Sequence, residues 1–247
     1  MDREVRVTCL RGRTSDRTDG AGAGAEALAR VLGGRIVGEP APGRPCDWSQ
    51  DLPEARPVLE AAAAELSAAL DQGELPVLTA SDCSICIATL PTVARRVPGV
   101  RFLWIDAHGD FNSPETTPSG FLGGMCLAAA CGRWDAGWPD TIDPEAVHFL
   151  GVRDLDPGER DDVEAAGVRR GVPEEGAVYV HFDCDGLDPG VMPVQFPVPG
   201  GLAMGEVREA LAGLAAAGRL VGLEVTALEH ADQAAAIAGL LPVELGP

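Results

Sequence analysis

The sequence predicts an α/β fold of three layers, α/β/α, around a central, mostly parallel sheet. Short apolar runs that end in glycine or polar residues recur along the chain, and Ala-rich stretches with helical periodicity separate several of them. Strands that alternate with helices form βαβ units, in which helices cover both faces of a parallel sheet. In such sheets the chemistry lies at the carboxyl ends of the strands.

The expected elements follow one another along the whole chain. The first strand, 5–10, leads into a loop or mobile flap over 11–24, and a similar segment at 40–53 precedes a helix over 58–70. Further strands are expected at 76–80, 100–105, 146–151, 177–182 and 220–225, with a helix over 206–217 before the last strand. Neither loop has the length or composition of an interdomain linker, so residues 1–247 are expected to form one domain.

Charge and composition exclude several functions. The formal net charge of -19 opposes contact with a phosphate backbone, so nucleic acid is not an expected partner. Every basic residue is Arg, and the absence of Lys excludes Schiff-base, pyridoxal phosphate and lysine-dependent phosphate-loop chemistry. The chain has no run of about 18 apolar residues and no secretory signal over 1–5, so we expect a cytoplasmic protein without a membrane partner. Its seven cysteines are accordingly expected to be reduced thiols.

Two acidic motifs directly follow predicted strands. In each, potential ligands alternate with other residues, so the period of two of an extended backbone places them on one side. The motifs comprise Asp106, His108 and Asp110 after one strand, and Asp183 and Asp185 after another. Four carboxylates this close would repel one another unless cations were bound, and oxygen-rich sites with one nitrogen suit Mn²⁺ or a similar hard divalent ion. The motifs therefore predict a metal site; the alternative is that they are surface carboxylates that cap helices.

The same stretches resemble those of a known family. Residues 104–112, 116–120 and 182–189 are similar to the metal-binding signatures of arginases, agmatinases and formiminoglutamases, the ureohydrolases. The resemblance implies a metal-dependent amidinohydrolase with two divalent ions, which activate water for attack on the carbon of a guanidinium-like group. It further implies the role of each ligand: Asp106 and Asp183 bridge two ions about 3.5 Å apart, His108 and Asp185 complete one ion, and Asp110 helps to hold the other and can accept a proton in catalysis.

One metal ligand of the family is replaced in this chain. Where the family has a histidine in a Gly-Asp-His-Ser loop, residues 81–84 read Ser-Asp-Cys-Ser, so Cys83 takes the place of the histidine. A thiolate binds divalent metals but adds negative charge to a site that already has four carboxylates, and its softer sulfur makes Zn²⁺ or Fe²⁺ more competitive with Mn²⁺. Alternatively, Cys83 is a buried neutral thiol and the ion on its side is weakly held or absent.

The resemblance also implies substrate contacts. Polar residues after the first motif match those with which arginases hold the amino-acid end of their substrate, and the segment 151–159 matches the one that faces the α-amino group. The matching residues are Asn112, Thr117, Ser119, Asp156 and Glu159, while a further family asparagine has become Phe121. A small guanidino amino acid is therefore expected as substrate rather than agmatine, which has no carboxylate. The alternative is that these residues only form turns.

Two further departures concern catalysis. Gly123 replaces the family's proton-shuttle histidine, and Ala227 replaces the glutamate that pairs with the guanidinium; Glu229 could substitute only if the register slipped by two. An N-hydroxyguanidine is less basic than a guanidine and depends less on a countercharge, so these departures favour it as the reacting group. The cysteine in place of a metal histidine and the missing shuttle histidine together resemble the hydroxyarginine-cleaving members of the family, which implies cleavage of Nω-hydroxy-L-arginine to hydroxyurea and L-ornithine within D-cycloserine biosynthesis.

Alternatives to this function stay open at the level of sequence. The substrate could be L-arginine, agmatine or another guanidino or formimino compound, or the chain could be a noncatalytic family member that binds metal or a partner protein. His181 and His230 are spare proton carriers by position, although such histidines are more often structural. Arginases usually assemble through a C-terminal extension, and because this chain ends soon after its last expected helix, at 241–247, a monomer is expected.

Overall fold

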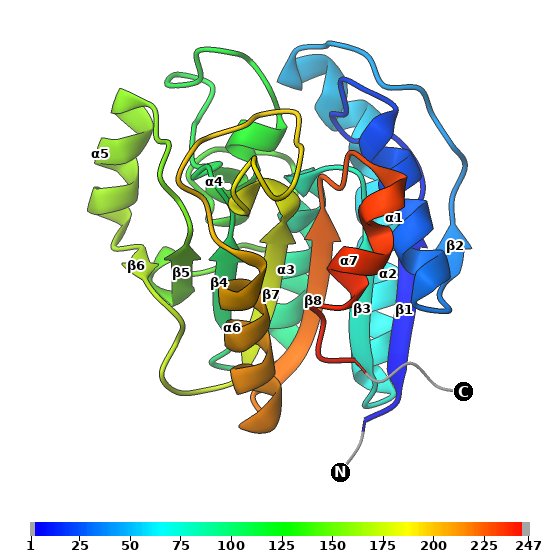
Figure 1. The fold of residues 1–247 in the computed structure, drawn as a ribbon. Helices are drawn as coiled ribbons and strands as arrows, with labels where there is room; N and C mark the ends of the chain where they lie inside the picture. Colours follow the sequence, from blue (N-terminus) through cyan, green and yellow to red (C-terminus); the bar gives the residue numbers. More distant parts are fainter. Residues whose placement is uncertain (1–2, 244–247) are drawn as a thin grey trace.

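The computed structural model describes residues 3–243, which contain one sheet of eight strands (Figure 1). The strand order is β2-β1-β3-β8-β7-β4-β5-β6, and every neighbouring pair is parallel. The strands are β1 (Val5–Leu10), β2 (Arg35–Val37), β3 (Leu75–Thr79), β4 (Arg101–Ile105), β5 (Val147–Leu150), β6 (Arg169–Arg170), β7 (Val178–Asp183) and β8 (Leu220–Thr226). The expected α/β fold is confirmed. The short strands β2 and β6, which the sequence analysis did not identify, form the two edges of the sheet.

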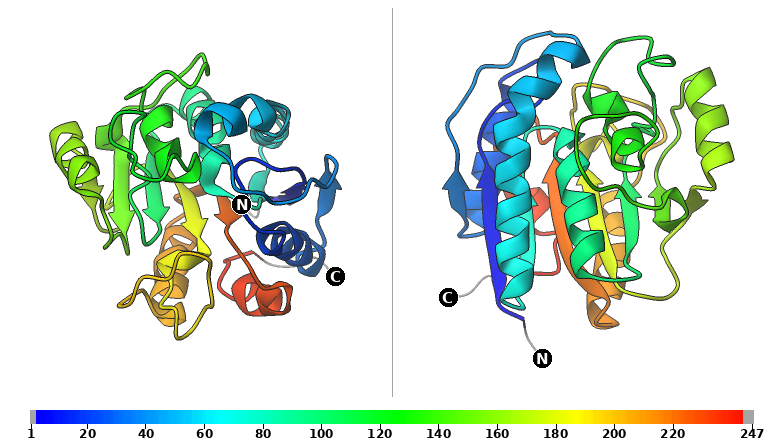
Figure 2. Two further views of the ribbon diagram at one scale, coloured as in Figure 1. Left: turned by 90° about the horizontal axis from the view of Figure 1, so that it is seen from above. Right: turned by 180° about the vertical axis from the view of Figure 1, so that it is seen from behind.

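Helices cover both faces of this sheet, as the alternation of strands and helices predicts. The α-helices of the described residues are α1 (Gly20–Val31), α2 (Trp48–Asp71), α3 (Cys86–Arg96), α4 (Cys126–Ala130), α5 (Pro157–Ala166), α6 (Met204–Ala216) and α7 (Ala234–Ala238). Helices α1, α6 and α7 lie in front of the sheet in Figure 1, whereas α2 and α3 cover the opposite face, which the right-hand view of Figure 2 shows from behind.

Two hydrophobic clusters, one on each face of the sheet, hold the three layers together. Along β4 the side chains alternate between them: Phe102 and Trp104 belong to the cluster with α2 and α3, while Leu103 and Ile105 belong to the cluster with α1 and α6. Strands that are buried on both faces form continuous apolar runs, and for this reason the sequence identifies the central strands well.

The expected flap over 11–24 is shorter in the structure, because α1 already begins at Gly20. Glycine disfavours helices by about 1 kcal/mol relative to alanine, so local propensity pointed to a loop. The glycines instead permit close packing: a Cβ at Gly24 would lie 1.7 Å from the carbonyl oxygen of Leu228. The prediction of a loop over 20–24 is therefore wrong, since a tertiary contact decides this segment.

The expected loop over 40–53 is shortened in the same way by α2, which begins at Trp48. Asp47 caps this helix by accepting a hydrogen bond from the backbone N–H of Ser49 at 3.0 Å. The helix contains Pro53, which a sequence argument treats as a helix breaker. Burial of one face of α2 against the core outweighs that local cost, so the prediction of a loop over 48–53 is wrong.

The carboxyl ends of the four central strands β3, β8, β7 and β4 meet at one edge of the sheet, at the top of Figure 1. In the register of the sheet, Ile105 pairs with Phe182 and Asp183 pairs with Thr226. The two acidic motifs therefore follow neighbouring strands and lie beside each other, as the parallel sheet predicts.

Among residues 3–243, no helix is both long enough and apolar enough to cross a bilayer. The segment 241–247, from which a monomer was expected, lies partly outside the described residues, as does the N-terminal segment 1–5.

The close approach of α1 to Leu228 predicts opposite effects for two substitutions in one helix. Gly24→Ala is expected to lower the free energy of unfolding by about 1–3 kcal/mol, because the new methyl group displaces the helix from the Leu228 carbonyl. Gly22→Ala is the matched control: nothing lies within 4 Å of a Cβ there, so helix propensity should stabilise the protein by about 0.5–1 kcal/mol. Urea unfolding of both variants measures the difference, and equal effects would contradict this packing.

Candidate metal centre

A cavity of about 250 Å³ opens at the carboxyl edge of the sheet and collects most of the predicted site residues. Its lining includes all six predicted metal ligands, namely Cys83, Asp106, His108, Asp110, Asp183 and Asp185. Four of the five predicted substrate residues also line it: Asn112, Ser119, Asp156 and Glu159. Thr117 does not; its hydroxyl oxygen accepts a hydrogen bond from the backbone N–H of Gly120 at 3.1 Å and so stabilises a turn.

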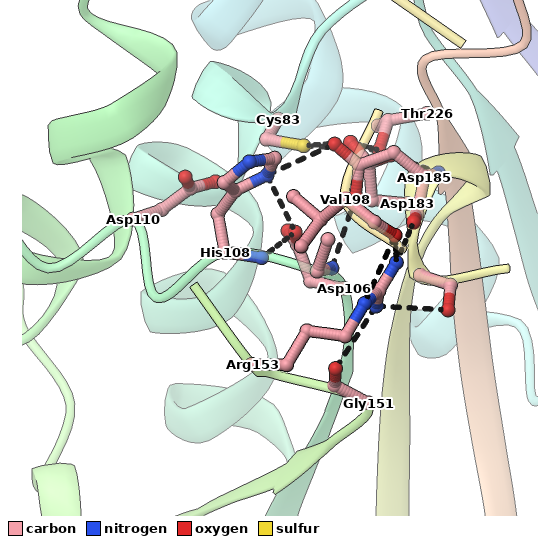
Figure 3. A network of polar contacts seen from close by, with 12 residues as sticks. Cys83, Asp106, His108, Asp110, Gly151, Arg153, Asp183, Asp185, Val198 and Thr226 are labelled. Atoms are coloured by element: carbon pink, nitrogen blue, oxygen red, sulfur yellow. Dashed lines mark hydrogen bonds and ion pairs between the residues drawn. The ribbon is translucent and has the colours of Figure 1, made fainter. Parts of the chain in front are cut away.

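One group of potential ligands consists of Asp106, His108 and Asp185, whose ligand atoms all lie within 4.8 Å of one another. His108 Nδ1 is 3.0 Å from Asp185 Oδ2 and 3.5 Å from Asp106 Oδ1, and dashed lines mark both contacts in Figure 3. The carboxylates are held from behind by the main chain, because the N–H groups of Ala107 and His108 donate to Asp185 and Asp106 at 3.0 and 2.7 Å. Two carboxylates and one imidazole of this group are therefore close enough to contact one ion.

The second group consists of Cys83, Asp106, His181 and Asp183, again with all ligand atoms within 4.8 Å of one another. Cys83 begins a short 3-10 helix after β3, and its Sγ lies 2.6 Å from Asp183 Oδ2 and 3.2 Å from Thr226 Oγ1. Asp106 is common to both groups, as a bridging carboxylate must be, whereas Asp183 belongs to the Cys83 group alone, so its role as the second bridge stays a prediction. The sequence analysis treated His181 only as a spare proton carrier, although its position two residues before Asp183 places both side chains on one face of β7.

Asp110 lines the cavity but belongs to neither of these groups. Its backbone has a φ of 49°, a left-handed conformation that is uncommon for a residue other than glycine. The N–H groups of Leu127 and Ala128 donate to its carbonyl oxygen at 3.0 and 3.2 Å and hold this turn in place. The role of Asp110 as a ligand and proton acceptor stays a prediction.

Arg153 fixes the loops beneath the metal-ligand groups (Figure 3). Its guanidinium donates to the carbonyl oxygens of Gly151 at 3.0 Å, Asp185 at 3.2 Å and Val198 at 2.6 Å. It thereby ties the segment after β5 to the segment after β7. A guanidinium with five donors suits this task, because it satisfies several carbonyl groups at once.

The carboxylates of the site repel one another when no cation lies between them, and this repulsion shifts their pKa values. Burial, followed by repulsion from neighbouring carboxylates, raises the pKa of Asp106 and of Asp183 well above the ordinary value. Burial opposes ionisation of Asp185 too, but the hydrogen bond and charge of His108 hold the pKa of Asp185 below its usual range. Burial lowers the pKa of His108, but its contacts with Asp106 and Asp185 outweigh burial and raise that pKa to about 12. Burial and then Asp183 raise the pKa of the Cys83 thiol, so a nearby cation is needed to stabilise a thiolate.

The predicted substrate residues form a connected wall of the cavity. Asn112 Nδ2 donates to Asp156 Oδ2 at 3.0 Å, while Asn112 Oδ1 is buried and has no hydrogen-bond partner among the described residues. Glu159 accepts the N–H groups of Phe111 and Asp156 at 2.8 and 2.9 Å, one on each carboxylate oxygen. Glu159 therefore shapes the start of α5 with Asp156 in a capping box, which leaves Asn112 and Asp156 as the groups better able to meet a ligand.

The two departures from the family pattern also lie in the cavity wall. A Cβ at Gly123 would lie 2.5 Å from the Phe121 ring and 3.1 Å from Asp82 Oδ2, so Phe121 occupies the space that a side chain at 123 would need. Ala227 follows directly after β8 with a φ of 55°. Glu229 also lines the cavity without a slip in register, but its carboxylate accepts the Thr18 hydroxyl at 2.9 Å.

A parallel sheet whose central strand ends present two ligand groups with a shared carboxylate is the arrangement of a two-metal hydrolase. The model of the Arginase family matches residues 45–172 and 165–240, and the chain belongs to this family of hydrolases. This membership confirms the resemblance that the two acidic motifs carry.

Individual relatives agree with the family assignment. The chain is 40% identical to the N(omega)-hydroxy-L-arginine amidinohydrolase of Streptomyces lavendulae, over 92% of this chain and 91% of the relative. It is 37% identical to the arginase of Bacillus caldovelox over 62% of each chain. The solved structure of native Bacillus caldovelox arginase superposes with a TM-score of 0.81 and 26% identity, and the comparison covers 100% of both chains.

The electrostatics of the site predict how metal affects stability at different pH. Because the pKa of Asp106 and Asp183 is raised, the metal-free fold is favoured while they are protonated, and this contribution is lost as the pH rises above 3.8, the ordinary aspartate value. Bound cations neutralise the repulsion among the ionised carboxylates, and they compete with protons for the same carboxylate oxygens. The rise in Tm on adding Mn²⁺ is therefore expected to be larger at about pH 8 than at about pH 5.

Differential scanning fluorimetry with Mn²⁺ or a chelator measures this effect. Asp106→Asn should lose most of the rise in Tm, whereas Asp140→Asn, which alters an exposed carboxylate paired with Arg95, should keep it. Equal rises at the two pH values, or an unchanged rise in Asp106→Asn, would show that the carboxylate cluster does not bind the ion.

Proposed function

We propose that the chain is a two-metal amidinohydrolase that cleaves Nω-hydroxy-L-arginine to hydroxyurea and L-ornithine. The observation that carries this proposal is the cavity wall, where Gly123 has no side chain to carry a proton, Ala227 has no carboxylate, and the Glu229 carboxylate accepts the Thr18 hydroxyl. The relative from Streptomyces lavendulae, which is named for this substrate, supports the same assignment. The chain resembles that relative along most of its length, beyond the metal motifs.

The ligand chemistry of the two groups suits divalent ions. Asp106 and Asp183 would bridge them, His108 and Asp185 would hold one, and Cys83 with Asp110 would hold the other. Bound ions would supply charge that allows the buried carboxylates to ionise, and would lower the pKa of water for attack on the guanidino carbon. We propose Mn²⁺ for the oxygen-rich position, while the sulfur of Cys83 favours Zn²⁺ or Fe²⁺ beside it.

The chain's own residues would orient the substrate across the cavity. The unpartnered Oδ1 of Asn112, the hydroxyl of Ser119 and the carboxylate of Asp156 lie in the wall that would receive the amino-acid end. The N-hydroxyguanidine end would then point to the acidic groups. Because this group is less basic than a guanidinium, Ala227 need not be a carboxylate. Asp110, in the same cavity, is the proposed proton acceptor.

The remaining expectations form part of the same proposal. The net charge of -19 supports a protein without a nucleic-acid partner. The monomeric state, the cytoplasmic location and a place in D-cycloserine biosynthesis stay predictions.

A comparison of substrates tests the proposal directly. With Mn²⁺ supplied, kcat/KM for Nω-hydroxy-L-arginine is expected to exceed that for L-arginine by about 100-fold or more, since the missing countercharge and shuttle together should cost at least about 3 kcal/mol with the more basic substrate. Release of L-ornithine from each substrate, and a parallel assay with agmatine, provide the measurement. A preference for L-arginine or agmatine would overturn the substrate assignment, and metal loading without any hydrolysis would favour a noncatalytic protein.

The substrate wall yields a second prediction with a matched control. Asn112→Ala is expected to raise KM about tenfold, because it removes a hydrogen bond of about 1–1.5 kcal/mol to the amino-acid end. Thr117→Ala should change KM by less than about twofold, because the Thr117 side chain does not line the cavity and only stabilises a turn. Steady-state kinetics of both variants decide the matter; if the Thr117 variant has the larger effect, the substrate lies elsewhere.

A further inference from the structure

His181 occupies a position that the metal motifs of the sequence do not explain. It lies on β7, its side chain is 1% exposed, and its ring stacks on Trp104 with the centroids 3.7 Å apart and the planes at 7°. Its Nδ1 lies 2.7 Å from Glu224 Oε1, and its Nε2 has no hydrogen-bond partner among the described residues. A buried polar atom without a partner costs about 1–3 kcal/mol, so this nitrogen requires a physical explanation.

The partner on the other side of the ring determines what Nε2 can do. Glu224 is fully buried, and its second carboxylate oxygen accepts the Tyr179 hydroxyl at 3.0 Å. In a neutral imidazole, donation of the Nδ1 proton to the Glu224 carboxylate at 2.7 Å leaves a lone pair on Nε2. The Trp104 ring and the Glu224 carboxylate together fix the orientation of the imidazole.

The imidazole lies beside the ligand atoms of the Cys83 group, because one ring nitrogen of His181 is within 4.8 Å of Cys83 Sγ and of a carboxylate oxygen of both Asp106 and Asp183. Ligands around one divalent ion lie about 3–4.5 Å from one another when each is about 2.0–2.3 Å from the ion. The spacing of the four side chains therefore fits a single ion. Metal-binding histidines commonly donate their other ring N–H to a carboxylate, which is the relation between His181 and Glu224.

We propose that His181 Nε2 is a ligand of the ion on the Cys83 side, with Glu224 as the residue that positions it. This inference rests on the two-metal centre of the proposed function and deepens it. The Cys83-side ion is then held by one thiolate, one imidazole and carboxylate oxygens of Asp106 and Asp183, and His181 takes the place that the proposed function gave to Asp110, which belongs to neither ligand group and keeps its proposed role as proton acceptor. The other ion is held by His108, Asp185 and the bridging carboxylates, without sulfur.

The two positions consequently differ in their chemistry. A set of one sulfur, one nitrogen and two oxygens suits Zn²⁺ or Co²⁺, whereas the sulfur-free position is better matched to Mn²⁺. The His181 imidazole also replaces the nitrogen that the Cys83 side loses where other family members have a histidine. A neutral ligand at this point adds no charge to the crowded carboxylates.

Cobalt binding tests the inference with a readout other than activity. Co²⁺ bound by a thiolate gives a sulfur-to-cobalt absorption band, which reports the Cys83 side alone. His181→Gln is expected to weaken the Co²⁺ affinity measured through this band by about 100-fold or more, and Glu224→Gln by about 10–100-fold, as loss of a positioning carboxylate does. His148→Gln is the matched control, because His148 is a buried histidine on β5, which β4 separates from β7, and it belongs to neither ligand group of the described residues.

An unchanged affinity and an unchanged band in a folded His181→Gln variant would overturn the inference. If that variant fails to fold by circular dichroism, X-ray absorption of His108→Asn loaded with one equivalent of Zn²⁺ gives the answer, because His181 is then the histidine beside the sulfur. One sulfur with an imidazole shell supports the assignment, and sulfur with oxygen alone refutes it. Neither measurement depends on substrate turnover, so a wrong substrate and a wrong ligand assignment give different results.

Discussion

The repulsion among buried carboxylates at the end of the parallel sheet is the constraint on which the site depends. Asp106, Asp110 and Asp183 are buried, and desolvation raises the pKa of each well above its ordinary value. A fold tolerates such a cluster when cations compensate it, because isolated buried charges cost several kcal/mol each. Main-chain N–H groups donate to Asp106 and Asp185, His108 offsets part of their charge, and further compensating cations would enter from the open cavity.

The sheet builds this cluster from short segments that are far apart in the sequence. Asp106 and Asp183 leave adjacent strands, Cys83 begins the turn after β3, and Thr226 ends β8 beside them. Hydrogen bonds between neighbouring strands fix the start of each segment, and contacts among the loops fix its end. Among these loop contacts, the Arg153 guanidinium joins the loops that follow β5 and β7. A rigid frame of this kind can hold ligand atoms at spacings that side-chain flexibility alone would not maintain.

The departures from the family pattern are coherent once their surroundings are considered together. Phe121 fills the space beside Gly123, with the Arg17 guanidinium 4.6 Å above its ring and Phe196 at 5.4 Å, so this side of the cavity is aromatic. The Phe121 ring thus lies in the space that a shuttle side chain at position 123 would need. At the Cys83 group, the ring nitrogen of His181 on β7 takes the place of the histidine nitrogen that Cys83 does not provide. Several residues of the cavity therefore differ from the family pattern together, which is consistent with a different reacting group on the substrate.

The sequence by itself determined the central strands, the carboxyl edge as the place of the site, and both acidic motifs, because these depend on short-range periodicity and on the rule that parallel strands end together. It also identified Cys83, Gly123 and Ala227, since a motif can be aligned residue by residue. Only the tertiary structure decided that α1 starts at Gly20 and that Thr117 stabilises a turn instead of lining the cavity. It likewise decided that both oxygens of Glu159 accept backbone N–H groups and that His181 lies beside Cys83. These facts depend on contacts between segments that are distant along the chain, and neither propensity nor spacing within one segment carries that information.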